Sequence, residues 1–270
     1  MSDSPNEFSG ARVALIAACE EMDGLLNGLV DSKGRIVDEI HQVRKAGKRL
    51  RGALTIIGEP KPCVRWLAVI GKMLGESRDA TVRVQVWRDL GFDQPGPNSV
   101  EAVIASVLAL EADAARRCPT REVVEWARSA VTQLKNRLEA RSDEEIAEDA
   151  EVGADKLYRQ LRKRLKRTYQ RSRDADFQEC RKVIIEWTGG MSLIAPNLEL
   201  PGEDEAARLS ENLGEESDLE VLAQWMTKRG FSSAIAGAAW KVLRKRQEKV
   251  RRLSMSLIRK ELSPVFKLKL

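Results

Sequence analysis

The sequence predicts an all-α protein, on the basis of its helical periodicity and the positions of its prolines. Apolar residues recur at intervals of three and four in segments rich in Ala, Leu, Glu, Lys and Arg, which is typical of amphipathic helices. No sustained run alternates apolar and polar residues as a half-buried strand does. At 270 residues the chain is long enough for one large domain or two ordinary ones.

The prolines place the breaks between the predicted helices, because proline interrupts a helix and restricts the residue before it. In chain order they are Pro5, Pro60, Pro62, Pro95, Pro97, Pro119, Pro196, Pro201 and Pro264. Acidic segments are expected at connections and in short helices. Helices are therefore predicted near residues 8–30, 35–58, 62–75, 78–90, 99–117, 120–141, 151–174, 176–194, 203–213, 217–229 and 232–262.

Two short motifs occur twice along the chain. Leu74–Asp79 is matched by Leu213–Asp218, and His41–Lys45 is matched by Gln178–Lys182. Both matches keep the same order, at offsets of 139 and 137 residues. Self-similarity of this kind indicates internal duplication. We therefore expect the chain to consist of two related helical halves.

Charge is segregated along the chain. Residues 156–173 carry nine Lys and Arg and no acid, and residues 41–51 carry five and no acid. Residues 139–155 carry eight acids against one arginine. The boundary between the halves is placed inside this acidic stretch, which gives residues 1–141 and 142–270, together one domain. Long helices with cationic sides predict binding of a common anion.

Cysteine and histidine usage limits the possible chemistry. The four cysteines, which contain no CxxC pair, are expected to be reduced and buried; they are Cys19, Cys63, Cys118 and Cys180. A single histidine argues against a histidine-rich metal centre, and no metal or other cofactor is expected. No stretch approaches the ~20 apolar residues of a membrane helix, and no secretory signal is recognised. A cytoplasmic protein is therefore expected.

The helix predicted over residues 35–58 sets a basic stripe against an apolar one. Val43, Gly47, Leu50 and Leu54 lie on the apolar side. The stripe runs from residue 41 to residue 52, about 16 Å at 1.5 Å per residue. Its candidate ligands for a polyanion are His41, Arg44, Lys45, Lys48, Arg49 and Arg51.

Other basic helices add further candidates. The helix predicted over 151–174 supplies Arg159, Arg162, Lys166 and Arg173, and the helix near the C-terminus supplies Lys241 and Arg244. The second copy of the motif supplies Arg181 and Lys182. That copy has lost other polar positions of the first, because Gln178 replaces the histidine, Ile185 replaces Lys48 and Glu186 replaces Arg49.

The ordered set of these motifs resembles the CHAD family, the conserved histidine α-helical domain. The resemblance rests on the segments His41–Arg51, Leu74–Asp79, Tyr169–Arg173, Arg181–Lys182 and Ser263–Phe266, and it covers nearly the whole chain. It implies two helical bundles related by pseudo-twofold symmetry, with a basic cavity that binds inorganic polyphosphate. Association with polyphosphate granules is a further expectation. The chain departs from the family pattern at Gln178, Ile185, Glu186 and Thr188.

Polyphosphate binding fits the residues, since a linear anion without bases needs Lys and Arg along a groove and no aromatic platform. Aromatics make up 5% of the chain, which disfavours a nucleic-acid-binding helical protein, the main alternative. A phosphohydrolase or transferase, or an accessory protein to one, is a second alternative. No GxxxxGK[ST] loop supports it, so a non-enzyme is predicted. A scaffold for an acidic protein remains a third alternative.

Asp79 and Asp218 occupy equivalent positions in the two copies of the second motif. Each is expected at the start of a helix, where a carboxylate favours the exposed N–H groups. The alternative is that each pairs with an arginine of the first motif and orients it.

Overall fold

The computed structural model describes residues 7–30, 36–115 and 119–270, and the regular elements within these ranges are all helical. The predicted all-α class is confirmed for this part of the chain. The helices are α1 (Ala11–Gly28), α2 (Ile36–Ile56), α3 (Lys61–Met73), α4 (Gly75–Trp87), α5 (Val100–Ala115), α6 (Arg121–Glu139), α7 (Asp143–Arg171), α8 (Asp174–Ile194), α9 (Glu203–Lys228), α10 (Gly237–Leu257) and α11 (Ser263–Val265). Single π-helical turns extend α4 over Arg88–Phe92 and α10 over Ile258–Leu262.

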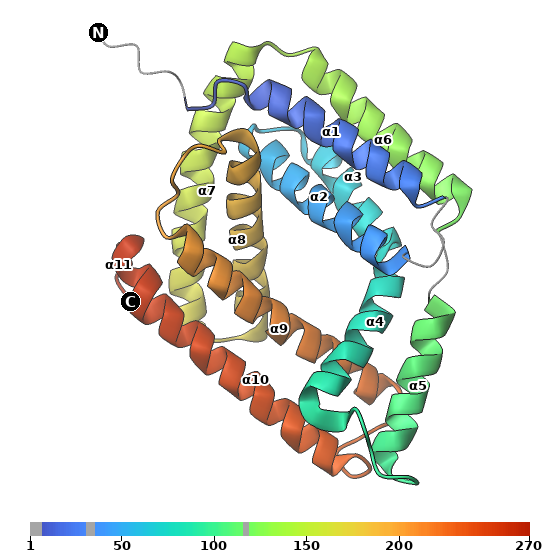
Figure 1. The fold of residues 1–270 in the computed structure, drawn as a ribbon. Coiled ribbons are helices and arrows are strands. Elements are labelled where there is room, and N and C mark those ends of the chain that lie inside the picture. The colour runs from blue at the N-terminus through green and yellow to red at the C-terminus, as the bar shows by residue number, and fades with distance from the viewer. Residues whose placement is uncertain (1–6, 31–35, 116–118) are drawn as a thin grey trace.

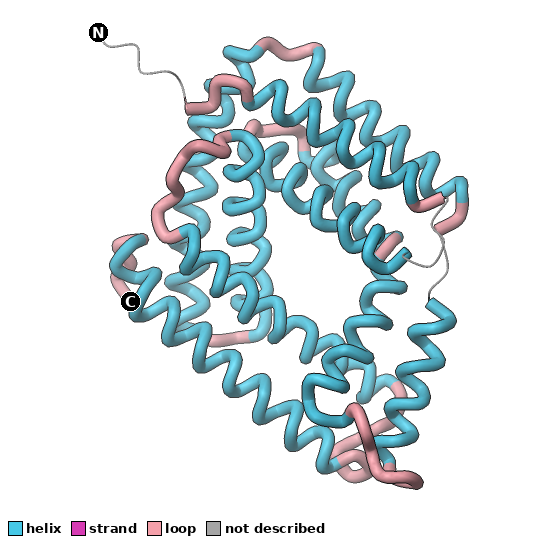
Figure 2. Tube along the Cα trace, in the orientation of Figure 1, coloured by secondary structure: helices cyan, strands magenta, loops and turns pink. Residues whose placement is uncertain are grey.

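Four helices form a closed circuit of contacts. α2 packs on α8, α8 on α9, α9 on α4 and α4 on α2, and these helices surround the middle of the molecule in Figure 1. α1 and α3 pack on α2, α6 packs on α1, α7 on α8, α5 on α4 and α10 on α9. The longer connections run around the outside in Figure 2. Both copies of each repeated motif therefore lie on helices of the circuit.

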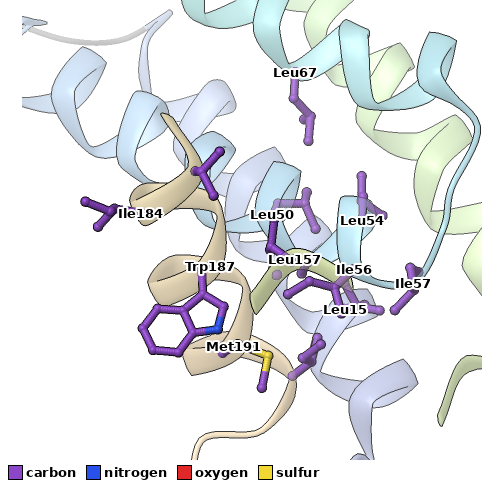
Figure 3. Close-up of a cluster of buried hydrophobic side chains, with 14 of the residues drawn as sticks. Leu15, Leu50, Leu54, Ile56, Ile57, Leu67, Leu157, Ile184, Trp187 and Met191 are labelled. Carbon is purple, nitrogen blue, oxygen red and sulfur yellow. The ribbon is translucent and has the colours of Figure 1, made fainter. Parts of the chain in front are cut away.

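The hydrophobic residues form two cores. The larger core lies among α1, α2, α3, α6, α7, α8, the first half of α9 and the C-terminal segment 257–266. Figure 3 shows part of it around Leu50, Leu54 and Trp187. The smaller core lies among α4, α5, α10 and the second half of α9. Each core takes residues from both sides of position 142. The two cores therefore do not correspond to residues 1–141 and 142–270. The duplication of the sequence into these halves stays a prediction.

α2 and α8 cross at a contact between glycines. A Cβ atom on Gly190 would lie 2.7 Å from the carbonyl carbon of Gly52 and 2.8 Å from the backbone nitrogen of Ala53. A Cβ atom on Gly52 would lie 3.0 Å from the backbone nitrogen of Gly190. Only residues without a side chain allow two helix backbones to approach this closely. The crossing fixes the relative position of the two helices that carry the first motif.

Two predicted helix boundaries are wrong. α7 begins at Asp143 rather than near 151, because Ser142 and Glu145 form a capping box and acidic side chains stabilise the first turn of a helix. The segments predicted as 203–213 and 217–229 form one continuous helix, α9. The acidic stretches therefore belong to long helices, and Asp218 lies in the middle of α9 rather than at a helix start.

Several other expectations are settled for the described residues. Cys19, Cys63 and Cys180 are free and buried, as predicted, and burial raises the pKa values of Cys19 and Cys180 to about 12. Cys118, Pro5 and the predicted helix limits at 35 and 117 lie outside the described residues. Among the described helices, none combines the length and the apolar character needed to span a bilayer.

A cluster of cations on the helix circuit

Helices α2, α4 and α8 bring five cationic or imidazole side chains into mutual electrostatic range. We call this set the cationic cluster; it consists of His41, Arg44, Lys48, Arg78 and Arg181. Burial, and after it the positive charges of Arg181, Arg44, Arg78 and Arg51, together lower the pKa of Lys48 to about 8. A lysine whose pKa is reduced in this way lies among cations that the protein does not fully neutralise.

His41 lies at the rim of the cluster on an exposed part of α2. Burial of part of the ring lowers its pKa below 6.5, and the charges of Arg78 and Lys48, followed by those of Lys45 and Arg44, act in the same direction. The imidazole is therefore neutral at pH 7, with one N–H group available as a donor.

Each motif arginine has the same arrangement of neighbours. A Cβ atom on Gly75 would lie 2.8 Å from Nη1 of Arg44, and a Cβ atom on Gly214 would lie 3.6 Å from Nη2 of Arg181. The glycine of the repeated Leu-Gly motif thus makes room for the arginine of the other motif. The approach is tight at Gly75, whereas at Gly214 an added Cβ would make an ordinary contact with Arg181.

The repeated aspartates act on these arginines. Burial lowers the pKa of Arg44, and the negative charge of Asp79 opposes that effect. Burial likewise lowers the pKa of Arg181, and Asp218 opposes it. Burial raises the pKa of Asp218 itself, while Arg181 and Arg78 counteract the rise. Each aspartate therefore acts electrostatically on its motif arginine, and the pairing that orients the arginine stays a prediction.

Hydrogen bonding leaves part of the cluster without protein acceptors. Nη1 of Arg44 donates a short hydrogen bond to the carbonyl oxygen of Gly71 at the end of α3, which fixes the direction of this side chain. The Nε groups of Arg181 and Arg51 are buried and have no hydrogen-bond partner among the described residues. Buried donors without acceptors are costly, and an anion would supply the missing acceptors.

A pocket of about 420 Å³ opens beside the cluster between α2 and α3. Arg44, Lys48 and Arg51 line it from α2, Lys72 lines it from α3, and Asp79 lines it from α4. Four cations against one carboxylate make the pocket electropositive. A charge of this sign in a concave, partly dry site favours anionic groups.

The α8 crossing shortens the basic stripe predicted on α2. Gly52, expected on the stripe, is buried under α8. Arg51 forms an ion pair with Glu186 at 3.4 Å, and the side chain of Arg49 lies beside Gly189. Burial raises the pKa of Glu186 while Arg51 opposes the rise. The stripe therefore ends at the crossing, because the helical period alone does not show where another helix packs.

The predicted cations of α7 do not join the cationic cluster. Arg159 forms an ion pair with Asp155 on its own helix. Arg162 donates to the carbonyl oxygens of Phe266 at 2.7 Å and Lys267 at 3.2 Å, so it anchors the C-terminal segment. Lys166 is half-buried and Arg173 is exposed at the start of α8. The apolar side of α7 faces the larger core, which turns these cations away from the circuit.

The remaining predicted residues are also dispersed. Lys45 is exposed next to His41, and Lys182 forms an ion pair with Glu179 at 2.8 Å. Lys241 and Arg244 are exposed on α10, where Arg244 stacks over the ring of Trp240. For all of these residues, a role in ligand binding stays a prediction.

Arg78 is the cluster member that sequence reasoning missed. Its charge acts on His41, Arg44, Lys48, Arg181 and Asp218. Its position inside the repeated Leu74–Asp79 motif was a usable signal. In the second copy Ser217 stands at the equivalent position, so this charge comes from one copy alone.

The described residues thus form an all-helical fold with the cationic cluster where α2, α4 and α8 come together. This chain belongs to the CHAD family, because the model of the CHAD domain matches residues 15–227. The resemblance read from the sequence motifs is thereby confirmed.

The solved structures provide a related fold. The crystal structure of the CHAD domain from the plant Ricinus communis matches with a TM-score of 0.52 and 18% sequence identity, covering 96% of this chain and 90% of that chain. At this identity the likeness establishes the shared fold. A comparison with curated proteins finds no match.

Proposed function

We propose that this protein binds inorganic polyphosphate at the cationic cluster and catalyses no reaction on it. The observation that carries the proposal is the electropositive pocket lined by Arg44, Lys48, Arg51 and Lys72, beside which the buried Nε group of Arg181 has no acceptor among the described residues. Like charges this close are unfavourable in the free protein, and a polyanion would relieve the repulsion.

Polyphosphate suits the geometry better than a compact anion does. The donors lie on three helices and continue along the pocket between α2 and α3, so a linear chain with many charges can contact several of them. Arginine can hold phosphoryl oxygens with two N–H groups at once, while lysine provides a compact charge. The cytoplasm and polyphosphate granules are the proposed location.

The decisive test compares two charge-matched double variants. Arg44→Ala with Lys48→Ala removes two cations from the cluster, whereas Lys241→Ala with Arg244→Ala removes two exposed cations from α10. At moderate salt the first variant should bind long-chain polyphosphate about 100-fold more weakly, since each charge-assisted contact is worth about 1.5–3 kcal/mol. The second should stay within about threefold of the wild type, as exposed charges contribute little.

An independent readout is available because the chain has one histidine. Its imidazole NMR signal should move when polyphosphate is added, and its pKa should rise as the bound anion offsets the neighbouring cations. Equal affinities of the two double variants, with no change at His41, would contradict the proposed site. Ready displacement of polyphosphate by single-stranded or duplex nucleic acid would favour the nucleic-acid alternative.

A further inference from the structure

A second pocket, of about 730 Å³, adjoins the first pocket at Arg51. The two pockets share Arg51 and Ala68 in their walls, so they are adjacent at these residues. The second pocket is lined by five cations from four helices; these are Arg51, Lys61, Arg65, Lys156 and Lys182. Two carboxylates accompany them, Glu59 and Glu186.

One face of α3 runs along both pockets. Lys61 and Arg65 line the second pocket, Lys72 lines the first, and Ala68 lines both. Residues at positions 61, 65, 68 and 72 follow the spacing of a single helix face, and all four are exposed. The row spans about 16 Å along the helix axis, and its one small residue, Ala68, lies where the two pockets meet.

Most cations of the second pocket lack an internal counter-charge. Glu59 is held by Arg137 at 3.1 Å and by Arg141 at 3.3 Å, so its charge is already balanced from outside the pocket. Arg51 pairs with Glu186 and Lys182 with Glu179. Among the described residues no ion pair involves Lys61, Arg65 or Lys156.

The pocket on the other side of the cluster is less suitable for an anion. A pocket of about 680 Å³ between α4, α5 and α9 adjoins the first pocket at Asp79. There Glu111 accepts hydrogen bonds from Arg83 at 3.2 Å and from Nε1 of Trp225 at 2.7 Å, and it also pairs with Arg229. Three cations, Arg83, Lys228 and Arg229, line that pocket with two carboxylates, Glu111 and Asp79, so its excess of positive charge is smaller than that of the second pocket.

We infer that a polyphosphate chain bound at the cationic cluster continues in one direction, past Arg51 and along α3 into the second pocket, so that long chains bind more tightly than short ones. This inference rests on the proposed function and assigns Lys61, Arg65 and Lys156 as contacts for the distal part of the chain. A short oligophosphate occupies the cluster and the first pocket and does not reach them.

The test compares tripolyphosphate with long-chain polyphosphate on three proteins. The first is the wild type, the second carries Lys61→Gln with Lys156→Gln, and the third carries Lys163→Gln with Lys249→Gln. Lys163 and Lys249 are exposed on α7 and α10 and line neither pocket, so both variants lose the same net charge. Melting temperatures of all three proteins verify that the fold is intact.

Lys61→Gln with Lys156→Gln should weaken binding of long chains about 2- to 30-fold, the effect of two exposed charge contacts worth about 0.2–1 kcal/mol each, and should leave tripolyphosphate affinity unchanged. The slope of log affinity against log salt for long chains should fall by about 1.4, by analogy with single-stranded nucleic acids. The Lys163→Gln with Lys249→Gln control should match the wild type for both ligands.

Two results would overturn the inference while leaving the proposed function standing. In the first, both double variants lose long-chain affinity equally, which indicates a general charge effect. In the second, tripolyphosphate affinity falls as much as long-chain affinity, which places Lys61 and Lys156 at the cluster itself. A wild type that binds neither ligand would instead refute the proposed function, and the inference with it.

Discussion

Lys48 illustrates how the fold sets the charge of a single side chain. It is half-buried on α2, and its neighbours from α2, α4 and α8 are arginines, which keep their charge at all ordinary pH values. Burial and these neighbours lower its pKa to about 8. Lysine is therefore the member of the cluster whose charge changes with pH just above neutrality.

Affinity for polyphosphate should therefore fall by about tenfold as pH rises from about 7 to about 10, because Lys48 loses its proton and one charge-assisted contact is lost. The free energy of unfolding of the free protein should show an opposite contribution from Lys48. Between pH 8 and the ordinary lysine pKa of about 10.4, the unfolded chain holds more protons than the folded chain, so this contribution rises with pH.

Titrations of polyphosphate affinity and urea unfolding at a series of pH values would measure both effects. The matched variant is Lys48→Gln, which keeps the length of the side chain and removes its titration. It should bind more weakly than the wild type at pH 7 and show a flatter pH dependence. A wild-type profile that coincides with that of Lys48→Gln would disprove the assignment.

At the scale of whole helices, the contact between α2 and α8 depends on two glycines. Gly52 and Gly190 allow the backbones to meet, and the larger core packs around this crossing. The crossing also places Arg181 of α8 within electrostatic range of Lys48 of α2. The position of the cationic cluster therefore depends on an uncharged contact, the crossing of α2 and α8 at Gly52 and Gly190.

Gly190→Ala should destabilise the protein by about 1–3 kcal/mol, the usual cost of overpacking, because the new methyl group would clash with the backbone of α2. The matched control is Gly24→Ala, which also lies inside a helix and has no atom within 4 Å of the added Cβ. It should stabilise the protein by up to about 1 kcal/mol through helix propensity. Chemical denaturation of both variants gives the comparison, and equal stabilities would rule out close packing at the crossing.

The sequence predicted the elements better than their contacts. The spacing of Val43, Leu50 and Leu54 correctly indicated the buried side of α2, and the repeated motifs identified Arg44 and Arg181. The same spacing placed Gly52 on the exposed side, because periodicity describes one helix and gives no information about where a second helix crosses it. Arg78 was missed for the same reason, since its importance comes from the meeting of α4 with α2 and α8.

Chain breaks were predicted in the acidic segments, and two of these predictions failed. The acidic segment before residue 155 stabilises the start of α7 through its capping box. The break predicted between residues 213 and 217 does not occur, because α9 continues through this segment and packs into both hydrophobic cores. A local preference cannot reveal a requirement imposed by a distant side chain.

At the scale of the molecule, the two hydrophobic cores share α9. Leu209 and Leu213 belong to the larger core, and Leu222 and Met226 belong to the smaller one. Asp218 lies between these pairs, beside the cationic cluster. α10 joins them as well, with Leu243 and Val250 in the smaller core and Leu257 in the larger one. The cores are thus joined by helices rather than by a loop, and the cluster lies beside α9 at this junction.

Saturation with long-chain polyphosphate should raise the melting temperature by about 5–10 °C at a free concentration of 100 times the dissociation constant. This follows from about 2.7 kcal/mol of binding linkage and a shift of about 2–4 °C per kcal/mol for a chain of this size. Because α9 spans both cores, one cooperative transition should move as a whole. Differential scanning calorimetry would measure this shift in melting temperature. A second transition whose temperature does not change with the ligand would contradict the connection of the two cores through α9.

The continuity of α9 restricts the insertions and deletions that the chain can accept during evolution. With 26 residues and a rise of 1.5 Å for each, the helix spans about 39 Å. Inserting or deleting one residue between Leu213 and Leu219 would rotate everything beyond it by about 100°, carrying the smaller core with it. Peripheral loops can change in length without this effect, whereas the segment of α9 between the two cores must keep its number of residues.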